Sequence, residues 1–462
     1  MAMSKRIDRT FFIILLTFLV FGCSKQNAGR NVQTVGVEKV IESTFNGDYQ
    51  QNIAVAINIG GPEYTGFDGI QYAADTLQLD APKLQSGTIK GSQDPTLYQS
   101  YRVGNMKIPL PVENGTYDIT FKFAEPDEVP VGGRLIDVYA QQQLLLKDVD
   151  IRKARDGNIL SSLDKTVTGI EVSNGVLELS LQGKSQLAVL HALIVRKSGI
   201  DTQASWQLVW QDEFDYQGAP DPEKWRFDVW PARKVNGEDQ AYTQRPKNVR
   251  VENGHLIIQG HKEEYGNAEY TSGRIHTMGT KDFLFGKVEV RARIPAGQGT
   301  WAAIWMLPSD PYKYSTTCSP NEDWQGSTTC DAWPNSGEID IMEYVGYDPT
   351  TIHGTVHTKA YYWMNWEQRK ASIDVDESVN QDFQVYSMEW GPDYISIAMN
   401  GIPYFYYANQ NEGWRAWPFD HPYHLILNLA IGGDWGRAGG PIDNSIFPVQ
   451  MDVDYVRIYQ RK

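Results

Sequence analysis

Apolar and polar residues alternate along short segments, and no stretch of the 462-residue chain shows a sustained helical period. In segment 285–294, Val288 and Val290 would face one side of a strand while Glu289 and Arg291 face the other. One face of that sheet is therefore wet or lines a cleft. Similar runs occur at 117–123, 135–140, 176–181, 187–195, 394–398, 404–407, 424–430 and 453–459. Such runs of four to eight residues predict an all-β protein.

The tryptophans divide the chain, because all 14 of them lie between Trp206 and Trp435. The polar stretch 198–205 is the expected boundary. We predict a smaller β-sandwich module over residues 51–198 and a larger body over 204–462, although the pattern leaves a barrel open for the module. A body as large as residues 204–462 without helices suggests two broad curved sheets with a groove on the concave face.

The N-terminus has the features of an export signal. Three basic residues precede the apolar run 11–21, which is followed by a glycine and Cys23. Segment 19–23 resembles a bacterial lipobox, in which the cysteine is lipidated; an ordinary cleaved signal is the alternative. We predict a lipoprotein signal peptide over 1–22, a tether over 23–50 and an exported bacterial lipoprotein, anchored by lipid to the outer membrane or cell surface.

Charge and composition exclude several classes of protein. The chain has 57 acidic and 42 basic residues, a formal charge of −15, and a hydrophobic content of 41%. The acidity gives no electrostatic basis for binding nucleic acid, and the apolar content is too high for disorder. We expect a globular monomer.

Two cysteines remain besides Cys23. Cys318 and Cys330 form an even pair in an exported protein, which predicts a disulfide. Two buried free thiols are the alternative, and zinc is disfavoured because no histidine or further cysteine lies nearby to complete a site.

Three carboxylates occur within six residues of one predicted strand. Glu338 and Asp340 share a face, but Glu343 would point the opposite way unless one extra residue, most simply Ile341 or Met342, forms a bulge. With the bulge, leaning side chains would leave about 5 Å between the two Glu carboxyl groups, the separation of a retaining glycosidase. A solvated acidic face is the alternative, but such a face would alternate with basic residues.

Close carboxyl groups cannot all ionise freely. One is expected to stay protonated near neutral pH while another stays an anion, which supplies a general acid and a nucleophile from one site.

The motifs around this strand resemble glycoside hydrolase family 16 over residues 206 to 462. They are Trp210–Phe214, Asn236–Thr243, Ser272–Ile275, Gly299–Pro308, Trp333–Glu338, Gly354–Thr358, Leu427–Trp435 and Asp452–Arg457. The resemblance implies a β-jelly roll, with Glu338 as nucleophile, Glu343 as acid/base and Asp340 holding the charge and geometry of the nucleophile. The extra Met342 is the form of the laminarinase-like members.

The family further implies a substrate-binding set on the donor side of the cleft, made of Arg274, Trp333, His357 and Trp435. Trp305 lies in an apolar run and is expected to be core instead. No cofactor is expected to be required. A structural calcium on the convex side is implied by matches at Glu213, Gly254 and Asp454.

An insertion at residues 309–332 departs from the family pattern and carries both cysteines of the expected disulfide. Because it directly precedes the catalytic strand, it is expected to border the cleft and affect substrate choice.

The first body resembles the malectin-like carbohydrate-binding module. The matching segments are 56–61, 68–75, 97–101, 114–117 and 121–125. The family binds glucose oligomers through aromatic rings, which nominates Tyr64, Tyr98 and Tyr101 for stacking. A packing role for these rings and a spacer role for the module are the alternatives.

The carboxylate spacing predicts an enzyme that retains configuration, and the resemblance implies an endo-β-1,3-glucanase with β-glucan as its polysaccharide partner. A mixed-linkage β-1,3-1,4-glucanase, and then an agar- or carrageenan-type galactan hydrolase, are the alternatives among enzymes. An inactive surface glycan-binding lipoprotein is the alternative of another class, although a binder need not keep three neighbouring acids.

Overall fold

The computed structural model describes residues 50, 52–155, 157–198, 206–320, 322–376 and 378–462. These described residues belong to one compact unit. The expected signal peptide, Cys23 with its expected lipid, and all but the last residue of the expected tether lie outside the described residues. In the part of the chain that is described, no helix is both long and apolar enough to cross a membrane.

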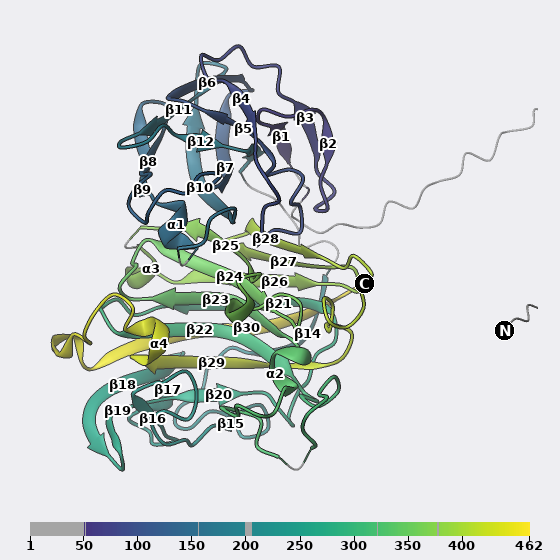
Figure 1. Cartoon of the computed structure of the whole chain (residues 1–462). Coiled ribbons are helices and arrows are strands. Elements are labelled where there is room, and N and C mark those ends of the chain that lie inside the picture. The colour runs from purple at the N-terminus through teal and green to yellow at the C-terminus, as the bar shows by residue number, and fades with distance from the viewer. Residues whose placement is uncertain (1–49, 51, 156, 199–205, 321, 377) are drawn as a thin grey trace, which may run out of the picture. The chain divides into compact units, whose positions relative to one another are not determined.

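The N-terminal module is built almost entirely from strands (Figure 1). They are β1 (Ile53–Asn58), β2 (Tyr64–Thr65), β3 (Gln71–Ala74), β4 (Lys83–Gln85), β5 (Ser100–Val103), β6 (Met106–Pro111), β7 (Gly115–Ala124), β8 (Ile136–Ala140), β9 (Gln143–Val149), β10 (Ser162–Val172), β11 (Val176–Gly183), β12 (Val189–Leu190) and β13 (Ala192–Lys197), with one helix, α1 (Ile151–Ala154). The order β6-β11-β8-β9 makes one sheet, β12-β5-β4 a second, and β10-β7-β13-β1-β3-β2 belongs to a third. A closed core of aliphatic and aromatic side chains fills the space between them.

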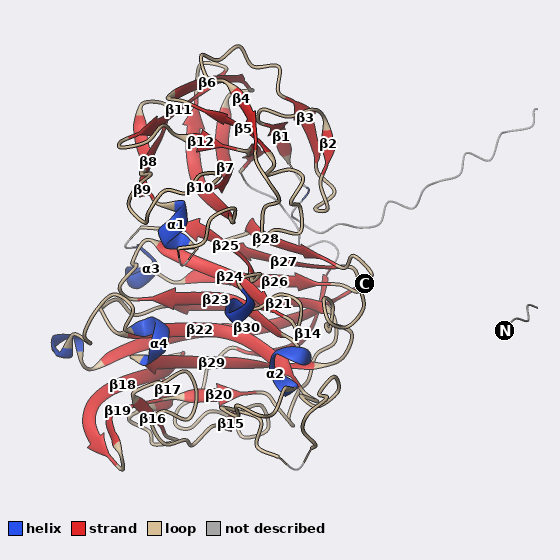
Figure 2. Ribbon diagram, in the orientation of Figure 1, coloured by secondary structure: helices blue, strands red, loops and turns tan. Residues whose placement is uncertain are grey.

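The C-terminal body has seventeen strands among its described residues. They are β14 (Trp206–Asp212), β15 (Arg226–Phe227), β16 (Gln240–Tyr242), β17 (Val249–Glu252), β18 (His255–Tyr265), β19 (Ala268–Ser272), β20 (Arg274–His276), β21 (Gly286–Arg293), β22 (Thr300–Pro308), β23 (Glu338–Val345), β24 (Thr351–His357), β25 (Arg369–Asp374), β26 (Gln384–Trp390), β27 (Tyr394–Met399), β28 (Ile402–Ala408), β29 (Tyr423–Ile431) and β30 (Val449–Arg461). Its helices are short: α2 (Ala332–Asn335), η3 (Trp363–Asn365), α3 (Ser378–Gln381), α4 (Gly433–Gly436) and η4 (Asn444–Ile446). Figure 2 shows how little of the molecule is helical. The prediction of an all-β chain is confirmed.

Two large sheets of this body enclose one core. One runs β15-β20-β29-β22-β23-β24-β25, and the other runs β16-β19-β18-β30-β21-β26-β27-β28. Buried side chains from both, such as Val290 of β21 and Ile304 of β22, belong to a single hydrophobic cluster. The predicted alternation in β21 is confirmed, because Val288, Val290 and Ala292 are buried while Arg291 stays half-exposed. Burial of one apolar face is the main force that fixes this register.

The two bodies share a sheet, which the sequence did not predict. Strand β10 of the module pairs in parallel with β25, with Lys165 opposite Ser372 and Thr166 opposite Ile373. The Nζ atom of Lys165 lies 2.6 Å from Oδ1 of Asp374, and both side chains are largely buried. The thirteen-stranded sheet therefore continues from the module through β25 and β24 to β23.

Candidate active site

Strand β23 carries the three neighbouring carboxylates between β22 and β24 (Figure 1). Ile304 of β22 pairs with Met342, but the next residue, Trp305, pairs with Asp340, so β23 contains one extra residue. The register with β24 shifts over the same interval. This is the expected bulge, and it returns Glu343 to the face that carries Asp340.

Glu338 begins β23, and its carboxylate accepts a hydrogen bond from one side and has a histidine ring near its other side. The indole Nε1 of Trp333 donates a 2.8 Å hydrogen bond to Oε2 of Glu338. The Nε2 atom of His357, which lies opposite Glu338 in the ladder, is 3.9 Å from Oε1. Burial raises the pKa of Glu338 to about 7, against the opposing effects of its hydrogen bonds with Asp340 and Trp333 and the positive charge of Arg274. These contacts favour its anionic form once it has lost the proton.

Asp340 is 1% exposed and is the acid that stays protonated most firmly. Burial, followed by the charges of Glu338 and Glu343, raises its pKa well above the usual range. The hydrogen bond between Asp340 and Glu338 raises the pKa of the first and lowers that of the second. A protonated Asp340 that donates to an ionised Glu338 accounts for both effects.

Glu343, at the other end of the carboxylate set, also has a raised pKa. Burial, and after it the charge of Glu338, raises its pKa to about 8. Its Oε1 accepts a 3.1 Å hydrogen bond from Nε1 of Trp301. Ala303 lies directly opposite Glu343 in the ladder. With a pKa of about 8, Glu343 keeps its proton near neutral pH.

His357 is buried and neutral. Burial lowers its pKa to about 3. Its Nε2 lies 3.6 Å from Oδ2 of Asp340, and its ring lies 5.7 Å from that of Trp333, between centroids. The ligand atoms of Glu338, Asp340 and His357 are close enough to one another to hold a metal ion. Glu338 and Asp340 share a proton, whereas carboxylate ligands of a metal must be deprotonated. The arrangement therefore fits acid–base chemistry better than metal binding.

Arg274 lies on β20 beneath two indole rings. Its guanidinium carbon is 4.4 Å from the ring centre of Trp230 and 4.7 Å from that of Trp305. Asp228 anchors the guanidinium through a 2.7 Å contact to Nε. Trp305 is half-exposed and donates a 2.7 Å hydrogen bond to Asn428, so the expectation that it belongs to the core was wrong. Residues 301 and 305 share the solvent-facing side of β22, and the apolar run around them hid that alternation.

Trp435 follows β29 and contacts the acid end of the site. Its ring packs edge-on against Trp301 at 5.5 Å between centroids, and it lies 5.2 Å from the ring of His353. The structure thus links Trp435 to Glu343 through Trp301, and brings Trp333 and His357 to Glu338. Trp301 was missed from the sequence. The sequence did carry a signal for it. Trp301 and Trp305 are four residues apart, with the small Ala303 midway, so all three lie on the same face of the strand that pairs with the carboxylate strand.

The insertion is tied to the start of the catalytic strand. A disulfide joins Cys318 and Cys330. The backbone N–H of Tyr314 donates to Oγ of Ser336, two residues before Glu338. The ring of Tyr314 stacks on Trp414 at 5.3 Å and 2°.

The implied calcium residues lie near one another but face arginines. Glu213 follows β14 and Gly254 precedes β18, and both strands pair with β30, which carries Asp454. Arg457 donates two 2.8 Å hydrogen bonds to Glu213, and Arg291 forms an ion pair with Asp454. This donor set, with its carboxylates neutralised, does not fit a calcium ion, and the calcium stays a prediction of the resemblance.

Most of the tyrosines nominated in the module pack against or hydrogen-bond with other residues of the protein. Tyr101 is buried, and its ring stacks on His191 at 5.0 Å. Tyr98 is buried and donates to Asp164, whose Oδ2 is 2.6 Å from Nζ of Lys122. Neither ring therefore offers a free face for a sugar.

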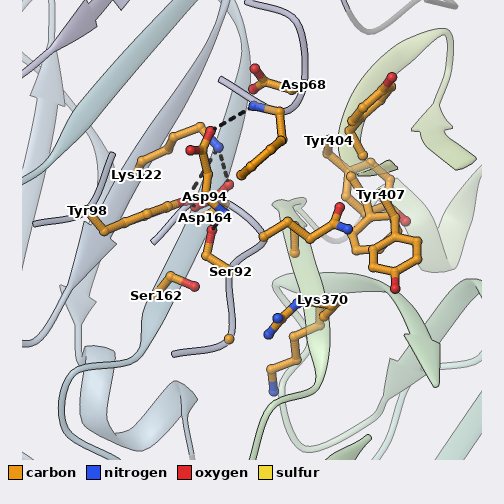
Figure 3. A pocket seen from close by; sticks show the side chains of 17 residues that line it. Asp68, Ser92, Asp94, Tyr98, Lys122, Ser162, Asp164, Lys370, Tyr404 and Tyr407 are labelled. Carbon is orange, nitrogen blue, oxygen red and sulfur yellow. Dashed lines mark hydrogen bonds and ion pairs between the residues drawn. The ribbon is translucent and has the colours of Figure 1, made fainter. Parts of the chain in front are cut away.

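Figure 3 shows Tyr98, Lys122 and Asp164 grouped on one side of a pocket, with Tyr404 and Tyr407 of β28 on the other. Tyr64 is half-buried and donates a hydrogen bond to Asp94. Of the three nominated tyrosines, Tyr64 keeps the most exposed ring.

Two family models match the chain. The model described as glycosyl hydrolases family 16 matches residues 236–457, and the model described as malectin domain matches residues 53–202. The beta-glucanase of Rhodothermus marinus is 46% identical over 266 residues, which cover 56% of this chain and 87% of that protein.

Solved structures agree with these matches. The laminarinase from Rhodothermus marinus superposes with a TM-score of 0.50 and 45% identity, covering 56% of this chain and 98% of that one. A non-specific endo-beta-1,3(4)-glucanase is 42% identical, with a TM-score of 0.50, over 57% of this chain and 95% of its own. The prediction of a jelly-roll body after a separate β-module is confirmed.

Proposed function

The chain belongs to glycosyl hydrolase family 16, and on that premise we propose that it hydrolyses β-1,3-glucan as a retaining endo-glycosidase. The observation that carries the proposal is the bulged strand β23, which sets an ionisable Glu338 and a proton-holding Glu343 on one face. The relatives named as beta-glucanase and laminarinase support β-1,3-glucan as the substrate.

The first half of the reaction forms a glycosyl-enzyme. Glu343 gives its proton to the glycosidic oxygen while the Glu338 carboxylate attacks the anomeric carbon, so the bond to the leaving sugar breaks as the ester bond forms. Asp340 keeps its proton and donates to Glu338, which favours the anion before attack. Trp333 fixes the other side of the same carboxylate through its 2.8 Å hydrogen bond.

The second half uses water. Glu343, now ionised, takes a proton from a water molecule that attacks the anomeric carbon, and Glu338 leaves as a carboxylate. Two inversions give net retention. The neutral His357 beside Glu338 adds no positive charge, and it can hydrogen-bond a sugar hydroxyl.

The direct test is reducing-sugar release by the full chain from laminarin, mixed-linkage glucan and agarose side by side. We expect laminarin to be hydrolysed fastest. Preference for mixed-linkage glucan would favour the β-1,3-1,4-glucanase alternative, which similarity to the non-specific endo-beta-1,3(4)-glucanase also supports. Preference for agarose would favour the galactanase alternative. No release from any of them would favour the inactive glycan-binding protein.

The role of Glu338 has its own test. Glu338→Ala is expected to abolish hydrolysis, because the nucleophile is gone, yet to regain glycosyl transfer from an α-glycosyl fluoride, which mimics the intermediate. Full retention of hydrolysis by this variant would sink the assignment. Glu223→Ala, on an exposed loop, is the control.

We also propose that the protein is an exported monomer held at a membrane by lipid on Cys23. Support comes from the basic, apolar and lipobox-like segments of the N-terminus. Incorporation of radiolabelled fatty acid into the wild type but not into Cys23→Ser tests the anchor. Size-exclusion chromatography of the lipid-free chain tests the oligomeric state.

A further inference from the structure

An aromatic surface lies close to the active site and has no role in the mechanism. Among the described residues, Trp363 and Trp366 are the two tryptophans that are mainly exposed, at 53% and 50%, and Met364 between them is 50% exposed. Singly exposed apolar side chains are ordinary, but adjacent ones usually mark a binding surface. We call these three residues the aromatic platform.

The platform lies on the loop that joins β24 to β25. β24 ends at His357, and Tyr362 of the loop directly precedes the platform. The ring of Tyr362 packs edge-on against Trp333 at 5.8 Å between centroids, and Trp333 donates to Glu338. A chain of side-chain contacts thus leads from the nucleophile to the start of the platform.

The loop is fastened from within, mainly by Asn365. Its Oδ1 accepts hydrogen bonds of 3.1 Å from the backbone N–H groups of Tyr362 and Glu367, and its Nδ2 donates to the carbonyl of Ala360 at 2.7 Å. Trp366 has a φ of +64°, which is rare for a bulky residue and costs free energy. The fold therefore keeps both indole rings exposed even though the backbone conformation of Trp366 is unfavourable.

The N-terminal module supports the base of this loop. Nζ of Lys90 lies 3.4 Å from Oε1 of Glu367, and the backbone N–H of Gly91 donates to the other oxygen of that carboxylate at 3.4 Å. Arg155 donates to the carbonyl of Gln368 at 3.4 Å. Module and loop are coupled next to the active site.

We propose that Trp363 and Trp366 form an additional glucan-binding subsite for sugar units beyond those held at Trp333. This inference rests on the proposed function and names a part of the substrate site. The C–H faces of glucose rings match flat indole surfaces, and the contacts from Glu338 through Trp333 to Tyr362 make the polysaccharide the occupant. Loss of the rings weakens binding of a long chain without altering the reacting groups.

The test compares a polymer with a short substrate, using the full chain. For Trp363→Ala/Trp366→Ala we expect the KM for laminarin to rise about fivefold or more, given the usual worth of an aromatic contact. The kcat for laminarin, and kcat/KM for a short β-1,3-gluco-oligosaccharide, are expected to stay within about twofold. Trp363→Phe/Trp366→Phe should retain most of the affinity, and Leu208→Ala, exposed on β14, is the control.

The outcomes separate the two proposals. If the wild type hydrolyses neither substrate, the proposed function fails. If it hydrolyses both and the alanine variant keeps the wild-type KM for laminarin, the subsite is overturned. An equal loss on the polymer and the short substrate would also overturn it, because that result indicates a distorted active site.

Discussion

Two tryptophans donate hydrogen bonds to Glu338 and Glu343, the two acids to which we assign the chemistry. The N–H of Trp333 lowers the pKa of Glu338, and the N–H of Trp301 lowers that of Glu343, each against a larger rise from burial. The hydrogen bond from Trp333 lets Glu338 ionise at a lower pH. The hydrogen bond from Trp301 lowers the pH at which Glu343 loses its proton. On the proposed mechanism, we therefore expect the two indoles to affect opposite sides of the pH profile.

The pH dependence of kcat/KM follows from these shifts. Activity needs Glu338 ionised and Glu343 protonated, so it falls as pH drops through about 7 and as it rises through about 8. Trp333→Phe should move the acidic limb to higher pH, and Trp301→Phe the alkaline limb to higher pH. Measuring kcat/KM between pH 4 and 10 checks both, and limbs that move to lower pH would contradict the assignment.

The buried acids also reduce stability at neutral pH. The pKa of Glu343 is raised from 4.5 to about 8, so its contribution to stability is fully present below about pH 4.5 and is lost as pH rises through 8. Glu343→Gln is expected to raise the free energy of unfolding by about 3 kcal/mol at pH 7 and little at pH 4. Thermal unfolding at both pH values checks this, with the exposed Glu223→Gln as control. An equal effect at both pH values would be evidence against the linkage.

At the level of single residues, the sequence predicted the three acids better than the tryptophans that surround them. Three carboxylates in an apolar run violate the usual rules for a strand, so Glu338, Asp340 and Glu343 were conspicuous. The nearby tryptophans were ambiguous, because an indole in an apolar run fits a core as well as a cleft. Only the side of β22 on which Trp301 and Trp305 lie separates the two roles.

At the level of elements, the strands followed from alternation, whereas the insertion 309–332 has no periodicity to predict its path. Its position is set by polar contacts. Oδ1 of Asp331 accepts from the backbone N–H groups of Thr316 and Thr317, and Oγ of Ser336 donates to the carbonyl of Pro311. These side-chain-to-backbone bonds depend on tertiary contacts that a local pattern does not encode.

The disulfide in this insertion yields an element-scale prediction. Cys318→Ser/Cys330→Ser should lower the free energy of unfolding by about 3 kcal/mol or less, because the closed loop is short. It should also raise the KM for laminarin, since the loop is bonded to Ser336 beside β23. Thermal unfolding and steady-state kinetics check this. Dithiothreitol should reproduce the effect in the wild type and leave the double variant unchanged; a further loss in that variant would contradict it.

At the level of the whole molecule, the division into two β-bodies was visible in the tryptophan distribution. The shared sheet was not, because pairing between β10 and β25 joins residues about two hundred positions apart in sequence. Neither strand carries a signal for this pairing. Lys165 and Asp374 are individually unremarkable, and only their 2.6 Å contact shows that they stabilise the junction.

The junction can be tested through that ion pair. Lys165→Ala should destabilise the protein by about 2 kcal/mol, because it leaves Asp374 largely buried without its partner. Lys197→Ala removes an exposed pair in the same module and should cost less than about 0.5 kcal/mol. Differential scanning calorimetry checks both. Equal effects of the two substitutions would argue against a stabilising role for the junction.

The parallel pairing of β10 with β25 also affects how the enzyme can be divided. A strand that loses its neighbour presents a row of free N–H and C=O groups, which is a template for edge-to-edge association with another copy. Separating the catalytic half from its module would uncover β25 in this way. The module thus protects the edge of the catalytic sheet whether or not it binds sugar, and an isolated catalytic half would need a charged or proline-substituted edge to stay dispersed.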